Sequence, residues 1–261
     1  MGAGALIAAW ALPSAAALGA GAYLFWRHWW FWRNPRRTPP PGEGILSPAD
    51  GTVVYVRRME PGDEVVVSKR GRAARVSDIT RQDMAGPKHL VGVFMSPFDV
   101  HYNRAPVSGE VAAVSHYPAL TRNRHMGSMH LRSALRLLPI HANSPHIVEN
   151  ERTVTRFDGR VAGGALSCYV IQIAGGSVCG IESSVPVGGG VERGQVFGMI
   201  RIGSQVDVVV PALPHLEPTV RPGERVRAGE TVLFKVKGVH PEVASAAPST
   251  ATTRDTEDIK S

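Results

Sequence analysis

Short apolar stretches, each bounded by turn residues, follow one another through most of the chain after residue 44. Most are rich in valine and isoleucine, and their length suits strands rather than helices. The 28 glycines and 20 prolines interrupt the chain too often for long helices, so we expect only brief ones at Ile79–Met84 and Ser177–Ser184. The pattern predicts a mainly β (α+β) body over residues 45–240, with strands at Gly51–Arg57, Glu64–Val67, His89–Met95, Gly109–Val114, Thr153–Asp158, Ala165–Ile173, Gly198–Ile202, Val206–Val210 and Thr231–Val236.

Two glycine-rich segments near the end of this body, Pro186–Gln195 and Val220–Val236, place glycine turns between valines. They resemble the half-barrel modules of biotinyl and lipoyl domains, and so predict a half-barrel of that type. Residues 34–44 are rich in proline and are interpreted as a linker. Residues 241–261 are rich in Ala, Ser, Thr and charge, and we expect a disordered tail there.

The N-terminal segment has a different pattern, because residues 1–26 contain no charged side chain. As a helix, Ala3–Trp26 would rise about 36 Å, enough to cross a hydrocarbon core. Tryptophans and then arginines follow, which predicts a membrane anchor over residues 1–33 and a body on the cytoplasmic face of the cell membrane. A cleaved signal peptide is disfavoured because the positive charge comes after the apolar run. Pro13 and several glycines leave a kinked or re-entrant segment open.

The net charge of +7 suits either nucleic acid or an anionic membrane as partner. No nucleic-acid-binding motif is present, and all the tryptophans lie in the N-terminal segment, so nucleic acid is not expected. Attraction to anionic lipid headgroups fits the basic residues better. One basic stretch, interleaved with Met and Leu, suggests a membrane-facing or headgroup-phosphate-binding surface, with a merely solvated face as the alternative: Arg122, Arg124, Arg132 and Arg136.

The remaining composition points away from metal and thiol chemistry. Cys168 and Cys179 are interpreted as buried free thiols. The histidines show no ligand spacing with cysteine or carboxylate residues, so no metal is expected.

A Gly203-Ser204 pair lies between two β-rich stretches. Glycine leaves its carbonyl open to approach, and the next hydroxyl can attack that carbonyl and convert the amide to an ester. Elimination would then turn the serine into dehydroalanine, and hydrolysis with loss of ammonia would leave an N-terminal pyruvoyl group. An ordinary hairpin turn is the alternative, so the rest of the chain must decide between them.

Four separated segments supply that context: Phe31-Trp-Arg-Asn-Pro-Arg-Arg, Ser47-Pro-Ala-Asp-Gly, Ser96-Pro-Phe-Asp-Val-His and Ile202-Gly-Ser. In kind and order they resemble the phosphatidylserine decarboxylase proenzymes, especially the shorter prokaryotic form. The resemblance implies self-cleavage between 203 and 204 into a large β chain and a small α chain that stay together as a heterodimer; a homodimer of that pair is left open. It also implies a covalent pyruvoyl cofactor derived from Ser204, which forms a Schiff base with phosphatidylserine and yields phosphatidylethanolamine and CO2.

The resemblance also implies roles for His101 and Asp50. His101 would donate a proton to the carbanion, and its usual pKa near pH 7 suits that role. Asp50 would belong to a charge relay that helps the serine attack. Each has a structural alternative, since His101 could bond to the Ser96 turn and Asp50 sits in a favourable Pro-Ala-Asp-Gly turn. Asp99 could orient His101 or cap its own loop.

One position departs from the longer members of the family, which carry a second histidine where this chain has Arg104. Three alternatives follow for self-cleavage. His101 could serve both steps, His89 or His116 could deprotonate Ser204, or the bond could break with little help from a base.

Two other functions compete with the phosphatidylserine decarboxylase. A membrane-anchored adaptor with a lipoyl-like module would explain the anchor and the glycine-valine texture, but not the Ser96–His101 segment. A decarboxylase for another serine-headed lipid or for a soluble amino acid would keep the chemistry, although the anchor disfavours the soluble substrate.

Overall fold

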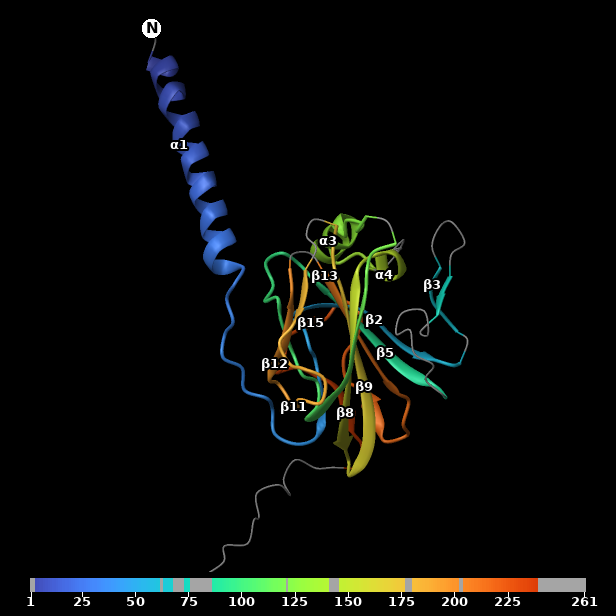
Figure 1. Ribbon diagram of the computed structural model, residues 1–261. Coiled ribbons are helices and arrows are strands. Elements are labelled where there is room, and N and C mark those ends of the chain that lie inside the picture. Colours follow the sequence, from blue (N-terminus) through green and yellow to red (C-terminus); the bar gives the residue numbers. More distant parts are fainter. Residues whose placement is uncertain are drawn as a thin grey trace, which may run out of the picture.

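The computed structural model describes residues 3–61, 63–67, 73–75, 86–120, 122–140, 146–176, 180–201 and 204–238. It begins with a helix, α1 (Ala3–Phe25), which continues into a short π-helix, η1 (Trp26–Trp30). Figure 1 shows α1 extending away from the β-rich body. The predicted N-terminal helix is therefore confirmed.

The prediction that this helix crosses a membrane is not confirmed. Among the described residues, no helix is both long enough and apolar enough to span a bilayer. Alanine and glycine make up much of α1, and Pro13 and Ser14 interrupt its few leucines. These residues favour the hydrocarbon core far less than Leu, Ile or Phe do. Sufficient length is therefore not by itself the mark of a membrane span.

One antiparallel sheet of eight strands forms the centre of the body (Figure 1). Strand β13 lies inside it and pairs with β9 on one side and β5 on the other. In sheet order the strands are β11 (Gly190–Val191), β7 (Gly109–Tyr117), β8 (Arg152–Val161), β9 (Gly164–Ile173), β13 (Ser204–Pro211), β5 (Lys88–Met95), β2 (Gly51–Met59) and β15 (Arg225–Val226).

Smaller sheets and short helices complete the described part of the body. Their members are β1 (Gly44–Leu46), β16 (Val232–Val236) and β14 (Leu216–Pro218) in one sheet; β10 (Ile181–Ser183), β12 (Val196–Ile200) and β6 (Tyr102–Arg104) in a second; β3 (Glu64–Val67) with β4 (Ala73–Arg75) in a third; and the helices α3 (Gly127–Ala134) and α4 (His146–Glu149). Figure 1 places α3 and α4 together at one end of the large sheet.

Apolar side chains cover both faces of the large sheet. Val208 of β13 belongs to one core cluster, together with Phe234 of β16. The next residue, Val209, belongs to a second cluster that includes Met129 of α3. Successive side chains of a strand point to opposite faces, so β13 is buried on both. This explains why three valines follow one another at 208–210 instead of alternating with exposed polar residues.

The predicted mainly β body is confirmed, and its strands form where the structure describes them, with small shifts at their ends. The predicted helix at Ser177–Ser184 is wrong in its described part, because Ile181–Ser183 pairs with β12 as a strand. The helix expected at Ile79–Met84 lies outside the described residues. Helix α3 escapes the sequence pattern because Met129 is its one buried side chain, which leaves little apolar periodicity to detect.

Other expectations have mixed outcomes. Cys168 is a buried free thiol, and burial raises the pKa of that thiol, which suits a packing role. Cys179 and the tail at 241–261 lie outside the described residues. The domain bounds and the likeness to lipoyl modules stay predictions.

Candidate active site

Ser204 is the first residue of β13, where the strand enters the sheet between β9 and β5. Its Cα partner on β5 is Met95, and its side chain is completely buried. The Ser204 hydroxyl donates to Met95 Sδ at 3.4 Å, and a thioether is a weak acceptor. The hydroxyl is therefore held without a strong partner. Gly203, the other half of the predicted cleavage bond, lies outside the described residues.

Two further polar side chains lie beside this serine in the interior. Asn103 of β6 directs Nδ2 at the same sulfur, Met95 Sδ, at 3.9 Å, and its Oδ1 accepts from Gln172 Nε2 at 2.8 Å. Both residues are fully buried, and Gln172 Oε1 has no hydrogen-bond partner among the described residues. A buried polar atom without a partner is costly. A hydrogen-bond donor placed in this interior could therefore bond to Gln172 Oε1.

His101 is also completely buried, just before β6 begins. Its Nδ1 lies 2.9 Å from the carbonyl oxygen of Asp99, so Nδ1 carries the hydrogen and donates it. Its Nε2 has no partner among the described residues, and Phe31 packs against the ring at 4.5 Å between centroids. Burial lowers the pKa of His101 to about 4. At neutral pH the imidazole is therefore uncharged, with a free lone pair on Nε2.

The structure brings the segments of His101 and Ser204 together without joining their side chains. The His101 carbonyl accepts from the Ile200 amide at 3.2 Å, four residues before Ser204 along the chain. Asn103, two residues after His101, shares Met95 Sδ with Ser204. The two predicted residues thus border one buried region but make no hydrogen bond with each other.

Asp50 has a different environment. Its Oδ2 accepts from Arg37 at 2.8 Å, and its Oδ1 accepts from the Ala228 amide at 2.7 Å. Burial raises the pKa of Asp50, while the bonds from Ala228 and Arg37 oppose that rise. The carboxylate therefore ties residue 37 of the predicted linker to the body. It makes no hydrogen bond with His101 or Ser204.

Asp99 both caps its loop and orients the histidine, through different atoms. The Asp99 carboxylate accepts from the Ser96 amide at 2.8 Å and forms an ion pair with Arg225. Its backbone carbonyl, not its carboxylate, fixes the tautomer of His101. Asp50 and Asp99 line one open pocket of about 680 Å³, together with Arg33, Arg37 and Arg225. This pocket lies beside the loop that carries His101.

Comparison with known proteins gives the family. A model of the phosphatidylserine decarboxylase family matches residues 25–234, which include all four motifs. The chain belongs to the phosphatidylserine decarboxylase family.

Relatives of this decarboxylase family cover most of the chain. A phosphatidylserine decarboxylase proenzyme of Chlorobium limicola is 34% identical over 236 residues, 90% of each chain. One of Thermobifida fusca is 36% identical over 204 residues, 78% of this chain and 71% of the relative. A provisionally named archaetidylserine decarboxylase proenzyme of Methanopyrus kandleri is 34% identical over 238 residues, 90% of this chain and 92% of the relative.

Within this decarboxylase fold, Arg104 holds the N-terminal linker. Its guanidinium donates to the Gly194 carbonyl at 2.9 Å, to Asn34 Oδ1 at 2.7 Å and to the Pro35 carbonyl at 3.1 Å. Asn103, the preceding residue, points into the polar interior, so Arg104 points out of it. The position that carries a second histidine in longer members therefore faces away from Ser204.

The two alternative bases lie far from Ser204. His89 pairs with Val210 at the opposite end of β13 and packs against Phe234. Six residues of strand separate it from Met95, about 20 Å. His116 lies on β7, three strands away from β13, or about 14 Å, and contacts Thr153 and Glu151. Neither histidine can reach the Ser204 hydroxyl in this fold.

A second polar network lies on the other face of β13. Gln205 Nε2 donates to Tyr55 Oη at 2.8 Å and to Asp207 Oδ1 at 2.7 Å, and Tyr55 donates to Asp207 Oδ2 at 2.7 Å. His146 Nε2 lies 3.2 Å from Gln205 Oε1. Burial raises the pKa of Asp207 to about 7 and lowers that of His146 to about 4.

The sequence reasoning does not identify Asn103, Gln172 or this network. A usable signal exists, because Gln172 and Asp207 are large polar side chains inside strands that are rich in valine and isoleucine. Polar residues in buried strands need partners.

Proposed function

We propose that this protein is a self-processing decarboxylase that converts phosphatidylserine to phosphatidylethanolamine and CO2 in phospholipid synthesis. Membership of the family and relatives named for this substrate support the proposal. The observation that carries it is the combination of a fully buried, weakly held Ser204 hydroxyl with a buried neutral histidine, His101, whose Nε2 has no partner among the described residues.

Self-cleavage would use the Ser204 hydroxyl as nucleophile. Its Oγ attacks the carbonyl carbon of residue 203, the peptide C–N bond breaks, and an ester forms. The hydroxyl proton passes to a base and then to the released nitrogen. Loss of the Cα proton of residue 204 expels the carboxylate of residue 203 and leaves dehydroalanine. Water then converts dehydroalanine to a pyruvoyl group and releases ammonia.

His101 is our candidate for the base. Its Nε2 lone pair is free at neutral pH, whereas Arg104 stays protonated and binds the linker. A histidine of low pKa holds no spare proton at the start of decarboxylation. The substrate's ammonium group must lose protons before its nitrogen can react, so Nε2 would accept one of these and later return it to the substrate carbon.

The residues around position 204 suit a pyruvoyl group. When formed, that group would supply a conjugated carbonyl that binds the substrate amine and withdraws the electrons left by CO2. Asn103 and Gln172 would border it with polar atoms, and Gln172 Oε1 has no partner among the described residues. Met95 would hold it from the paired strand.

The cleaved pieces would stay together as an α–β heterodimer. After cleavage, β13 would belong to the small α chain, while β5 and β9 would belong to the large β chain. β13 pairs with both strands, over Ser204–Pro211 on one side and Gln205–Val209 on the other. The hydrogen bonds of these two strand pairings, with the core beneath them, would hold the two pieces together after the peptide bond is broken. A homodimer of this pair stays a prediction.

We also propose that the protein works at the cytoplasmic face of the cell membrane, in contact with anionic lipids. Exposed tryptophans of η1, including Trp29 and Trp30, suit the membrane interface. This segment adjoins the site, because Trp26 Nε1 donates to the Pro97 carbonyl and Arg33 to the Phe98 carbonyl. Lipid contact there would occur beside the His101 loop.

The adaptor function is not favoured, because the chain belongs to a decarboxylase family. Intact mass of the full chain under denaturing conditions tests the proposal. We expect two pieces, 1–203 and 204–261, the second one ammonia lighter than its serine form. Ser204→Ala should stay uncut and inactive, whereas Ser183→Ala, an exposed serine, should be cut normally. Decarboxylase activity from a chain that stays uncut would contradict the proposed pyruvoyl cofactor.

A further inference from the structure

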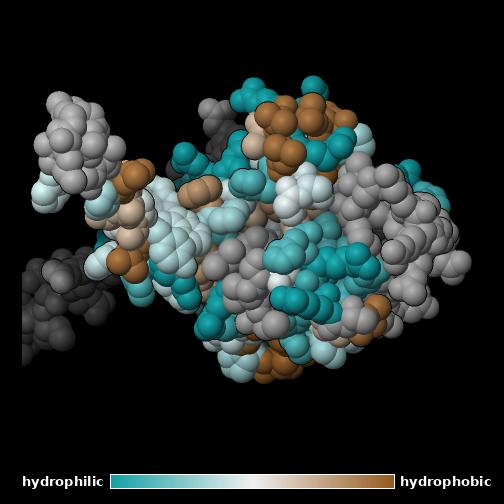
Figure 2. Space-filling view, turned by 90° about the horizontal axis from the view of Figure 1, so that it is seen from above, coloured by the Kyte–Doolittle hydropathy of each residue, from teal (hydrophilic) through white to brown (hydrophobic). Residues whose placement is uncertain are grey.

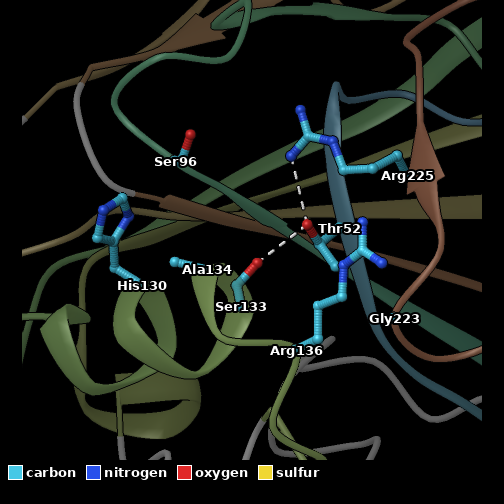
Figure 3. Close-up of a pocket in the computed structure, with 8 residues that line it drawn as sticks. All are labelled: Thr52, Ser96, His130, Ser133, Ala134, Arg136, Gly223 and Arg225. Atoms are coloured by element: carbon cyan, nitrogen blue, oxygen red, sulfur yellow. Dashed lines mark hydrogen bonds between the residues drawn. The ribbon is translucent and has the colours of Figure 1, made fainter.

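A second pocket, of about 530 Å³, opens where helix α3 approaches the edge of the large sheet. Figure 3 shows the residues that line it: Thr52, Ser96, His130, Ser133, Ala134, Arg136, Gly223 and Arg225. Its polar side chains are three hydroxyl groups, one imidazole and two guanidinium groups. No carboxylate is among these lining residues, so the pocket favours an anion.

The two arginines differ in how they are held. Arg225 donates to Thr52 Oγ1 at 3.3 Å and pairs with Asp99. Arg136 has no hydrogen bond or ion pair from its side chain to any described residue, and its backbone is left-handed, with φ of 53°. In Figure 3 both guanidinium groups lie near Thr52. An unpaired guanidinium beside a second one is a favourable partner for an oxyanion with several acceptor atoms.

This pocket adjoins the candidate active site. Ser96 follows directly after Met95, whose Cα is the register partner of Ser204. Neighbouring strands lie about 5 Å apart and a residue advances about 3.4 Å, so Ser96 Cα is about 6 Å from Ser204 Cα. In a serine phospholipid, four bonds separate the amine nitrogen from phosphorus. The pocket lies on the α3 side of the sheet and the Ser204 side chain on the other side. A lipid whose amine lies at residue 204 could therefore place its phosphodiester in this pocket by passing round the start of β13.

Exposed leucines lie in the same segment as the α3 residues that line the pocket. Leu138 is 57% exposed, and its Cδ2 lies 4.0 Å from the point where a Cβ on Gly223 would stand. The other exposed leucines of this segment are Leu131, Leu135 and Leu137. Figure 2 looks onto this end of the molecule and shows apolar atoms gathered next to hydrophilic ones. An anionic diester with apolar chains matches this combination better than a free anion does.

We propose that this pocket binds the phosphodiester of a serine phospholipid through Arg136 and Arg225, while the leucines at 131–138 contact its apolar chains. The proposal rests on the proposed function and names how its substrate is held. Ester-linked and ether-linked lipids share this diester, so the pocket would accept both. Of the four arginines that the sequence singles out, Arg136 is the one that lines it.

Binding to a protein that cannot turn over tests the proposal separately from the reaction. The Ser204→Ala full chain is titrated with a short-chain phosphatidylserine below its micellar concentration. Adding Arg136→Gln should raise Kd about tenfold to a hundredfold, because a charge-assisted contact is lost, and Arg136→Lys should lie between. Arg160→Gln is the matched control: it removes the same charge from an exposed residue of β8 outside the pocket and should change Kd less than twofold.

Two further ligands distinguish the sources of the anion. Inorganic phosphate should bind far more weakly than the lipid, and a short-chain diacylglycerol, which lacks the diester, should not respond to Arg136→Gln. An unchanged Kd for phosphatidylserine in Arg136→Gln, with an unchanged melting temperature, would overturn the proposal. Phosphate binding as tight as lipid binding would overturn the lipid assignment. Self-cleavage of the parent chain, measured by mass, reports on the proposed function and not on this pocket.

Discussion

The pH dependence of self-cleavage should identify the base. His101 is fully buried, and burial lowers its pKa to about 4 from an ordinary 6.5. A pKa lowered from 6.5 to about 4 corresponds to a free-energy cost of about 3 kcal/mol for charging the imidazole in the folded chain. If Nε2 accepts the Ser204 proton, the rate should follow the neutral fraction of this buried histidine rather than that of an exposed one.

The expected difference is large at pH 5. With a pKa near 4, about nine-tenths of His101 is neutral there, whereas with a pKa of 6.5 about 3% would be. The cleavage rate at pH 5 should therefore be close to the rate at pH 7.5, instead of about thirtyfold lower. His101→Gln, which cannot titrate, should slow cleavage by about a hundredfold or more at both pH values.

The assay begins with uncut full-length chain recovered from inclusion bodies in urea. The chain is diluted into buffers from pH 4.5 to 8, and the cut fraction is followed by intact mass. Near-ultraviolet circular dichroism of the Ser204→Ala chain verifies folding at each pH. A rate that falls with a midpoint near pH 6.5 while the fold is retained would refute the buried-base argument. Normal cleavage by His101→Gln would remove the histidine from this step.

Two other substitutions test residues whose contacts the structure defines. Asp50→Asn leaves the largely buried Arg37 with one carboxylate partner, Glu230, in place of two, so the free energy of unfolding in urea should fall by about 2 kcal/mol; full stability with no cleavage would instead support a catalytic relay. Arg104→His removes the contacts to Asn34 and Pro35 and points its imidazole away from Ser204. We expect a looser linker, seen as faster proteolysis, with no gain in cleavage rate, and faster cleavage would contradict this geometry.

Much of the fold can be predicted from the sequence because valine-rich stretches and glycine turns are local signals. The strands around Val208 and Phe234 follow from them. The prediction of a membrane span is not confirmed. Helix α1 is long but rich in alanine, and no helix among the described residues is both long and apolar enough to cross a bilayer. Helix α3 is not expected from the sequence, because Met129 is its one buried side chain and a single buried position leaves no periodic pattern.

The candidate site, like the fold, could be predicted only in part from the sequence. Motifs identify Ser204 and His101, because their neighbours along the chain form a recognisable pattern. The contacts around them join residues far apart in sequence, such as Gln172 with Asn103, and no local pattern reports such a pair. The catalytic role of Asp50 stays a prediction, and its contacts in the fold are to the linker and to a backbone amide.

The buried network on the far face of β13 bears on how residue 204 keeps its place after cleavage. A new chain end normally frays unless other contacts hold it. Here Gln205, the next residue, is hydrogen-bonded to Tyr55 and Asp207, and β13 pairs with strands on both sides. Burying Asp207 is unfavourable enough to raise its pKa to about 7. We infer that this buried polar group is tolerated because it fixes the start of β13, and with it the reactive residue.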